Sequence, residues 1–505
     1  MSDKDSGSKS KQGAGRMVRD VVLVAVILGG GFYWYLHRTE NSKAANKVAA
    51  EAKLLLLKDN PADYAAAEAK LKEVIEKYDS SHGYSLAALA ETDAILWGEN
   101  HVAAKQADAK AKTAAAMKAN PGIAEQYSAE ALVQTFDGKA SQAETFLTKD
   151  VLEKGGGGAR IYAALGQAQR AQGKLDDARR AFKAAFDADW RNPRFAQLIG
   201  ESYLEEGDAL NALAYFQKGL TANSEHFGSQ LGSARARLMR GEQIKEATEA
   251  IERAVAATDL TPALKARALT AQAELRLFEQ KVDQAIASAT KAAEVDPSFA
   301  WAFAAKARAE ARKNPGAAAA SFDKAIEADR YVAAFYFDAA EALIASGDAA
   351  KATSYLEKFP LKKDDRYFLK YGAVFAAAGQ LDKAIAKFDE AIKANETNAD
   401  AYLAKGSALV AQKKLDEAQK VLEIAVRARE FNPPVYVQLA NIRFEKKEWE
   451  EGMQQYATAL TQWRNSKAPR EQLTGAIQEV KQLLLKNGQK KYADVWESEA
   501  TQLVR

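Results

Sequence analysis

Apolar residues recur at intervals of three and four positions along the chain from about Asn41 onward. This spacing places them on one face of an α-helix, whereas a half-buried strand would require an alternation with a period of two. The positions between them are mostly Ala, Lys, Glu and Gln, which are good helix formers. The pattern therefore predicts an all-α protein built from short amphipathic helices.

Proline residues that follow Asn or Asp divide this helical pattern into units. A proline cannot continue the helix before it but is well accommodated at the start of the next one. These dipeptides therefore indicate boundaries between helices. They occur at Asn60-Pro61, Asn120-Pro121, Asn192-Pro193, Asp296-Pro297 and Asn432-Pro433.

The helices also repeat at a longer period. Gly166 and Gly200 are 34 residues apart, and so are Gly372 and Gly406. An alanine follows each of these glycines twelve residues later, and a large apolar residue comes four positions after the alanine. Two antiparallel helices need small residues where their backbones approach closely, and large residues fill the space beside them. The pairs are Ala178 and Phe182, Ala212 and Phe216, Ala384 and Phe388, and Ala418 and Leu422.

These residues resemble the tetratricopeptide repeat (TPR) family, in which W-x2-L-G-x2-Y and A-x3-F recur every 34 residues. Weaker copies bring the total to about twelve repeats. The resemblance implies an α-solenoid, a right-handed superhelix of about twelve helix pairs in which the first helix of each pair lines the concave face. Stacked repeats also need terminal caps with a polar outer face. We expect the solenoid over residues 39–468 and two capping helices over residues 469–505.

The N-terminal region has a different composition. Residues 1–16 are rich in Gly, Ser and Lys and lack the apolar residues that a core needs, so we expect a disordered tail. Residues 17–38 are apolar enough for a transmembrane helix, with an aromatic cluster typical of the membrane interface. The sequence thus predicts a single-pass, membrane-anchored TPR protein. Representative anchor residues are Val21, Val24, Ile27, Trp34 and Tyr35.

The sequence leaves open whether the anchor is cleaved and which way it crosses the membrane. Ser42 and Ala44 have the spacing of a signal-peptide cleavage site. Positive charges are slightly more numerous before the apolar segment than after it, which favours an internal N-terminus. In a bacterium this orientation gives an inner-membrane protein with the TPR domain in the periplasm; in the alternative the TPR domain faces the cytoplasm. Ala25 and Gly29 present a small face through which the span could form a homodimer, or the glycines form a flexible stretch.

Charge and chemistry narrow the classes of function. The net charge of +3 gives no strong attraction to nucleic acid, and the absence of cysteine excludes disulfides and thiolate metal sites. The four histidines are scattered without the spacing of a metal cluster, and no acid/base or nucleophile constellation stands out. We therefore expect no enzyme activity, no metal and no cofactor.

Positions on the expected concave face give a candidate binding groove. In the later repeats, the residues three positions before the small residue of the first helix are apolar. An apolar row of this kind suits a helix or an extended peptide, although it could instead pack on neighbouring first helices. In the middle repeats the equivalent residues are Ala163 and Gln197, and the charged residues Arg160, Arg170, Arg194 and Glu201 flank them, which gives a charged row instead. The candidate groove comprises Phe337, Ile344, Leu369, Leu403, Val410, Val437, Asn441 and Phe444.

These features favour a non-catalytic scaffold that docks proteins of an envelope-associated complex, such as a secretion, pilus, motility or outer-membrane assembly machine. One alternative is a chaperone-like client or targeting receptor, which would hold many partners weakly. Asn441 is the only asparagine beside a small position of a first helix, so the chain lacks the lysine and asparagine clamp that some TPR proteins use for chaperone tails. An envelope enzyme is the remaining alternative.

Overall fold

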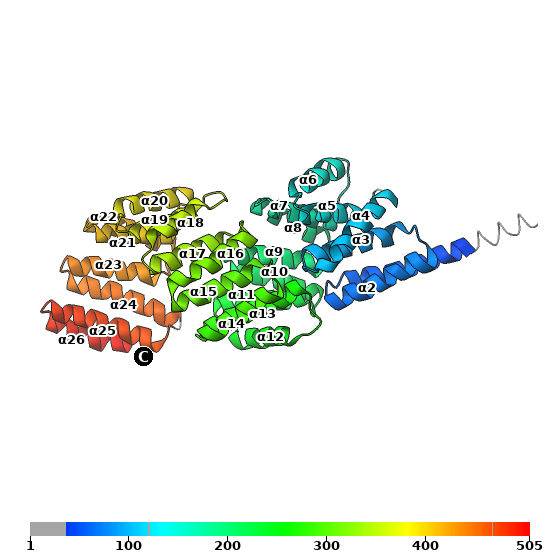
Figure 1. Cartoon of the computed structure of the whole chain (residues 1–505). Coiled ribbons are helices and arrows are strands. Elements are labelled where there is room, and N and C mark those ends of the chain that lie inside the picture. Colours follow the sequence, from blue (N-terminus) through cyan, green and yellow to red (C-terminus); the bar gives the residue numbers. More distant parts are fainter. Residues whose placement is uncertain (1–36, 120–121, 467, 505) are drawn as a thin grey trace, which may run out of the picture. The chain divides into compact units, whose positions relative to one another are not determined.

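The computed structural model of the protein describes residues 37–119, 122–466 and 468–504, and the regular structure in these ranges is entirely helical. Within each of two compact units, successive helices pack as hairpins, and each hairpin packs on the next (Figure 1). In these ranges, twelve hairpins precede residue 467 and a thirteenth follows it. The predicted all-α solenoid of helix pairs is therefore confirmed.

The described residues up to Ala305 form one compact unit. Its seven hairpins begin with a helix over residues 37–56. That helix pairs with α2 (Pro61–Glu73, continued by a π-helical segment at Val74–Tyr78); the others are α3 (Gly83–Gly98) with α4 (Gln106–Ala119), α5 (Ala124–Phe136) with α6 (Ala140–Thr145, continued to Leu152), α7 (Ala159–Arg170) with α8 (Leu175–Ala188), α9 (Pro193–Glu205) with α10 (Ala209–Ala222), α11 (Phe227–Arg240) with α12 (Ile244–Ala256), and α13 (Pro262–Phe278) with α14 (Val282–Val295).

The second unit starts at Lys306, within α15 (Ala300–Lys313). We number the hairpins in chain order, so that α15 and α16 form the eighth. The helices after α15 are α16 (Ala319–Ala328), α17 (Ala333–Ala345), α18 (Ala349–Glu357), α19 (Asp365–Ala377), α20 (Leu381–Ala394), α21 (Ala399–Ala411), α22 (Leu415–Ala428), α23 (Pro433–Glu445), α24 (Trp449–Asn465), α25 (Arg470–Lys486) and α26 (Lys490–Leu503).

The repeated glycines lie where the two helices of a hairpin meet. A Cβ atom on Gly200 would lie 2.7 Å from Cε1 of Phe216, and one on Gly406 would lie 2.6 Å from Leu422. Neither distance leaves room for a side chain, so the large residue of the second helix occupies the space that glycine leaves open. The 34-residue pattern therefore encodes the contact between the two helices of each hairpin.

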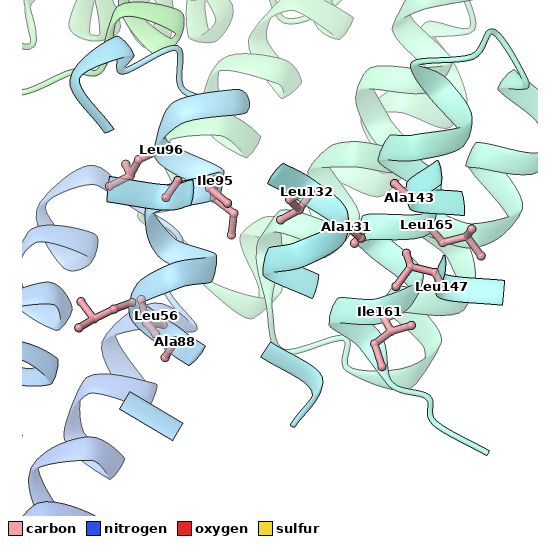
Figure 2. Close-up of a cluster of buried hydrophobic side chains, with 14 of the residues drawn as sticks. Leu56, Ala88, Ile95, Leu96, Ala131, Leu132, Ala143, Leu147, Ile161 and Leu165 are labelled. Carbon is pink, nitrogen blue, oxygen red and sulfur yellow. The ribbon is translucent and has the colours of Figure 1, made fainter. Parts of the chain in front are cut away.

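The apolar core passes from one hairpin to the next. In the first unit, a single cluster of buried side chains runs from Leu56 through Ile95 and Leu132 to Leu147 and Leu165 (Figure 2). These residues belong to the first four hairpins. Because no hairpin buries its apolar face alone, each depends on its neighbours for stability.

The last hairpin closes the second unit. Trp496 of α26 is 2% exposed and packs against the ring of Tyr456 in α24, and its indole Nε1 donates a hydrogen bond to the carbonyl of Ile477, at 2.9 Å. Leu473, Val480 and other apolar residues of α25 are buried in the same cluster. The hairpin therefore covers the apolar side of α24.

In the ranges that the structure describes, no helix has the length and the apolar character needed to cross a membrane. Of the predicted anchor at residues 17–38, only His37 and Arg38 lie within these ranges, at the start of the first helix. The predicted disordered tail and the anchor residues lie outside them. Those residues are Val21, Val24, Ile27, Trp34 and Tyr35.

Candidate protein-binding surface

Four first helices of the second unit, α17, α19, α21 and α23, pack side by side. Leu369, Leu403 and Val437 each occupy the fifth position of their helix, and they follow one another at intervals of 34 residues. All three side chains are half-buried. Each therefore packs partly in the core and keeps part of its surface available to a partner.

Two predicted groove residues belong to the core instead. Phe337 is 8% exposed, and its ring packs against Phe359 with the ring centroids 5.5 Å apart. Phe444 is 5% exposed, and its ring fills the space beside Gly452 and stacks on Trp449. The prediction that these two side chains line an open groove is wrong, because both rings are large enough to reach into the core, against Phe359 after α18 and against Trp449 of α24.

The other three predicted residues, Ile344, Val410 and Asn441, are half-buried. Val410 packs in the same cluster as Leu403, and Ile344 packs in that of Phe337. No cluster among the described residues contains the whole row, because each member packs mainly within its own part of the solenoid. We call the five half-buried apolar residues the apolar strip: Ile344, Leu369, Leu403, Val410 and Val437. Asn441, which is polar, lies on the same helix as Val437.

Charged residues on the first helices that carry the strip form ion pairs. Lys370 contacts Glu341 at 2.7 Å, across two first helices. Lys405 contacts Asp389 at 2.6 Å. Exposed ion pairs contribute little to stability but neutralise the local field. A partner on this surface would therefore be selected mainly by shape and apolar contact.

The first helices of the first unit carry a different surface. The guanidinium of Arg194 is only 5% exposed and binds both carboxylate oxygens of Glu99, with Nε 2.9 Å from Oε2. Arg160 pairs with Glu91 and with Glu125. We call this set the ion-pair ladder. Its other pairs are Arg170 with Glu205, Arg235 with Glu274, and Arg267 with Glu201.

The prediction of an open charged row in the middle repeats therefore needs correction. Arg160, Arg170, Arg194 and Glu201 do lie on first helices, but each is paired with a residue of another hairpin. Every side chain of the ladder is no more than 30% exposed. Because the charged side chains of the ladder pair with one another and are mostly buried, they leave little surface for an extended peptide.

The ladder also reveals a strong curvature in the first unit. Arg194 belongs to the fifth hairpin, whereas Glu99 directly follows the first helix of the second hairpin. Gln167 of the fourth hairpin also donates a hydrogen bond to Glu99, at 2.8 Å. First helices from different hairpins can reach one carboxylate only on the inner side of a tight curve. The ladder therefore lines the concave face of this unit.

Burial and neighbouring charges shift the pKa values of the ladder residues in opposite directions. Burial alone would lower the pKa of Arg194, but the carboxylate of Glu99 outweighs it and holds the pKa above the ordinary arginine value. Burial raises the pKa of the Glu91 carboxyl, and the charge of Arg160 opposes this shift without cancelling it. Buried pairs of this kind are costly to break from one side.

Sequence reasoning identified Arg160, Arg170 and Arg194 and one acid of the ladder, Glu201, but missed Arg235, Arg267 and the other acids. Glu91 and Glu99 lie in a repeat, residues 82–117, that matches the TPR pattern only in length. Their partners lie 69 and 95 residues away in the chain. The available signal was the opposite charge on successive first helices, but it does not reveal which helices the curvature brings together.

Comparison with known proteins defines the class of the repeats. Residues 163–227 and 375–439 each match a family model described as tetratricopeptide repeat. The two segments contain the copies with the clearest pattern, and one lies in each unit. The TPR prediction is confirmed for these segments. No curated protein matches the chain in sequence.

Several solved structures share the helical-repeat arrangement at low similarity. The human IFIT1 dimer with m7Gppp-AAAA is 16% identical, covers 74% of this chain and 89% of its own, and has a TM-score of 0.45. For yeast Tom70 these values are 15%, 88%, 96% and 0.42, and for the APC/C hetero-tetramer Cut9–Hcn1 they are 16%, 86%, 93% and 0.37. Similarity at this level carries no information about the partner or ligand.

Proposed function

We propose that this protein is a non-catalytic scaffold that docks partner proteins on the apolar strip of its second unit. The observation that carries the proposal is the half-buried row of Leu369, Leu403 and Val437 at one position of successive first helices. A helix or an extended segment with apolar side chains at regular spacing matches such a row. The neutralised charges beside it favour the same kind of partner.

The two units support a division of roles. The first-helix face of the first unit is filled by the ion-pair ladder, so we assign to this unit a structural role as a curved spacer. The second unit has the apolar strip on the corresponding helices. This difference makes the second unit the proposed docking part of the chain.

The apolar segment at residues 17–38 supports the further proposal that the scaffold is anchored in a membrane. In this proposal the protein is a bacterial inner-membrane protein, its repeats lie in the periplasm, and its partners belong to an envelope-associated complex. Protease treatment of intact and opened cells tests the topology. Digestion of the repeats only after the inner membrane is opened would contradict the periplasmic placement.

Crosslinking followed by affinity purification from membranes tests the scaffold itself. The proposal predicts recovery of one or a few partner proteins in fixed ratio to this chain. Many weakly bound proteins in variable ratio would favour a client receptor instead. Recovery of the chain without any partner in fixed ratio would contradict the scaffold.

A further inference from the structure

Two loops near the start of the first unit contact helices that lie five hairpins further along the chain. Residues 57–60, in the first hairpin, contact the start of α11 in the sixth. Residues 99–102, in the second hairpin, contact the start of α13 in the seventh and the loop after α14. The same offset in both cases indicates that five hairpins complete one turn of this unit.

The first contact joins three pairs of groups. The side-chain oxygen of Asn60 accepts a hydrogen bond from the backbone N–H of Phe227, at 3.0 Å, and Asn223 donates to the carbonyl of Lys58, at 2.9 Å. Nε2 of His226 lies 3.1 Å from the carboxylate of Asp59. Since the other ring nitrogen of His226 accepts from the backbone of its own helix, we assign the Nε2 proton to the bond with Asp59.

The second contact has the same composition. The carbonyl oxygen of Asn100 accepts from the backbone N–H of Ala263, at 3.2 Å, and its side chain accepts from the hydroxyl of Thr261, at 3.0 Å. Nδ1 of His101 lies 2.5 Å from the carboxylate of Asp296. Each contact thus combines an asparagine, a histidine–aspartate pair and the first turn of a distant helix.

Both asparagines accept a hydrogen bond from a backbone N–H at the start of a distant helix. The first backbone N–H groups of an α-helix have no partner within the helix, and Phe227 and Ala263 carry such groups in α11 and α13. Asn60 precedes α2 but makes no side-chain hydrogen bond to that helix. Its capping capacity is used on α11 instead, so formation of the contact completes the hydrogen bonding of a helix five hairpins away.

Both loops contain a residue in a left-handed backbone conformation, as do four other non-glycine positions of the described residues, Gln243, Gln280, Lys413 and Lys447. Asp59 has φ of 54° and His101 has φ of 55°, a left-handed conformation that is costly for residues other than glycine. The equivalent turns of the next three hairpins use Gly138, Gly173 and Gly207. At Asp59 and His101 the side chain bridges to a distant hairpin, a contact that glycine could not make. Strain of this kind persists only where the surroundings enforce it.

From these observations we propose that the two loop contacts form a latch that holds the first unit in its tightly curved, closed form. When both contacts are released, the unit opens towards a straighter solenoid, because the ion pairs of the ladder are then the main contacts between hairpins that are not neighbours. Opening separates the partners of the ion-pair ladder that belong to distant hairpins, such as Arg194 and Glu99. The latch therefore controls access to the concave face of the unit.

Paired spin labels in the full chain can measure the opening directly. The protein contains no cysteine, so Leu54→Cys and Leu210→Cys provide the only labelling sites. Both side chains are exposed, at 65% and 61%, so labels there disturb no core. The latch variant is Asp59→Gly with His101→Gly, which removes both bridging side chains while relieving the backbone strain.

A matched control separates the effect of losing the loop contacts from the effect of placing glycine in a left-handed turn. Gln280 also has a left-handed backbone, with φ of 61°, at the turn between α13 and α14. It is exposed and does not contact a distant hairpin among the described residues. Gln280→Gly should leave the label distances unchanged. We expect a single narrow distance distribution for the labelled wild type and for this control, and an added, shifted population for the latch variant.

Hydrogen exchange provides a second readout that does not depend on labels. The backbone amides of Phe227 and Ala263 should exchange about tenfold faster in the latch variant, because the loops that supply their acceptors are released. Amides in the second unit should be unaffected, which checks that the chain is folded. An unchanged distance distribution together with unchanged exchange at both amides would overturn the proposal. Faster exchange without a change in distance would also overturn it, since the contacts would then be local caps without control of the curvature.

Discussion

Gly372 and Gly475 both lie inside helices of the second unit, in opposite surroundings. A Cβ atom on Gly372 would collide with the ring of Phe388, whereas nothing lies within 4 Å of the corresponding point on Gly475. We predict that Gly372→Ala lowers the free energy of unfolding by about 1–3 kcal/mol through overpacking. Gly475→Ala should raise it by up to about 1 kcal/mol, because alanine favours the helix. Urea denaturation compares the two, and equal shifts would contradict the account of the repeat glycines.

Arg194 and Glu99 form the most enclosed pair of the ion-pair ladder. We predict that Arg194→Met lowers the free energy of unfolding by about 3–5 kcal/mol, because it leaves the carboxylate of Glu99 buried without a cation. Adding Glu99→Leu should restore most of the loss, since the uncompensated charge is then removed. Denaturation of the single and double variants measures both effects. A double variant no more stable than Arg194→Met would show that the pair does not act as a unit.

The carboxyl of Asp296 should make the stability of the latch depend on pH in the acidic range. Burial alone would raise the pKa of its carboxyl, but hydrogen bonds from His101 and Ser298 outweigh burial and hold the pKa below its ordinary value of 3.8. A lowered pKa means that the charged form stabilises the fold at neutral pH and that this stabilisation is lost as the pH falls through the folded value. Asp296→Asn should therefore be less stable than the wild type at pH 7. The difference should stay constant down to about pH 5 and shrink below about pH 4; a difference that grows on acidification would contradict this assignment.

At the scale of residues, the sequence predicted the contacts within a hairpin well and the contacts between distant hairpins poorly. Gly200 and Phe216 are 16 positions apart, and their pairing follows from the repeat period alone. Arg194 and Glu99 are 95 positions apart, and their pairing depends on how tightly the solenoid curves. Curvature results from small rotations summed over several hairpins, so no local pattern encodes it.

Among the elements, α26 shows how a terminal helix completes a repeat array. Trp496→Ala should lower the free energy of unfolding by about 3–5 kcal/mol, because it removes a buried ring and leaves a cavity beside Tyr456. Val495→Ala, one position earlier in the same helix, is the control, since Val495 is 39% exposed. Thermal denaturation followed by circular dichroism measures both. Similar melting temperatures for the two variants would contradict a closing role for α26.

The first helices illustrate why the candidate groove was predicted only in part. The spacing correctly located equivalent positions on α17, α19, α21 and α23, but burial at these positions depends on the size of the side chain. Leu369 and Leu403 stay half-buried, whereas the larger ring of Phe337 reaches into the core against Phe359. A periodic pattern specifies the face of a helix, and the volume of each side chain decides how far it extends into the neighbouring space.

At the scale of the molecule, the two units use one repeat for two purposes. In the first unit, the first helices carry charged residues that pair with one another, and two loops join distant hairpins. The second unit places half-buried apolar residues at the corresponding positions. The central claim is that this apolar strip binds partner proteins.

Affinity purification of the full chain from membranes, with and without changes to the strip, tests this claim most directly. The test variant combines Leu369→Asp, Leu403→Asp and Val437→Asp. The matched control places the same three charges at exposed apolar residues of the same unit, with Phe431→Asp, Leu485→Asp and Val495→Asp. Circular dichroism checks the folding of both, and the single variant Leu403→Gln provides a milder change. The account predicts that the test variant and Leu403→Gln lose the partners that the wild type and the control retain; full retention of the partners by a folded test variant would contradict it.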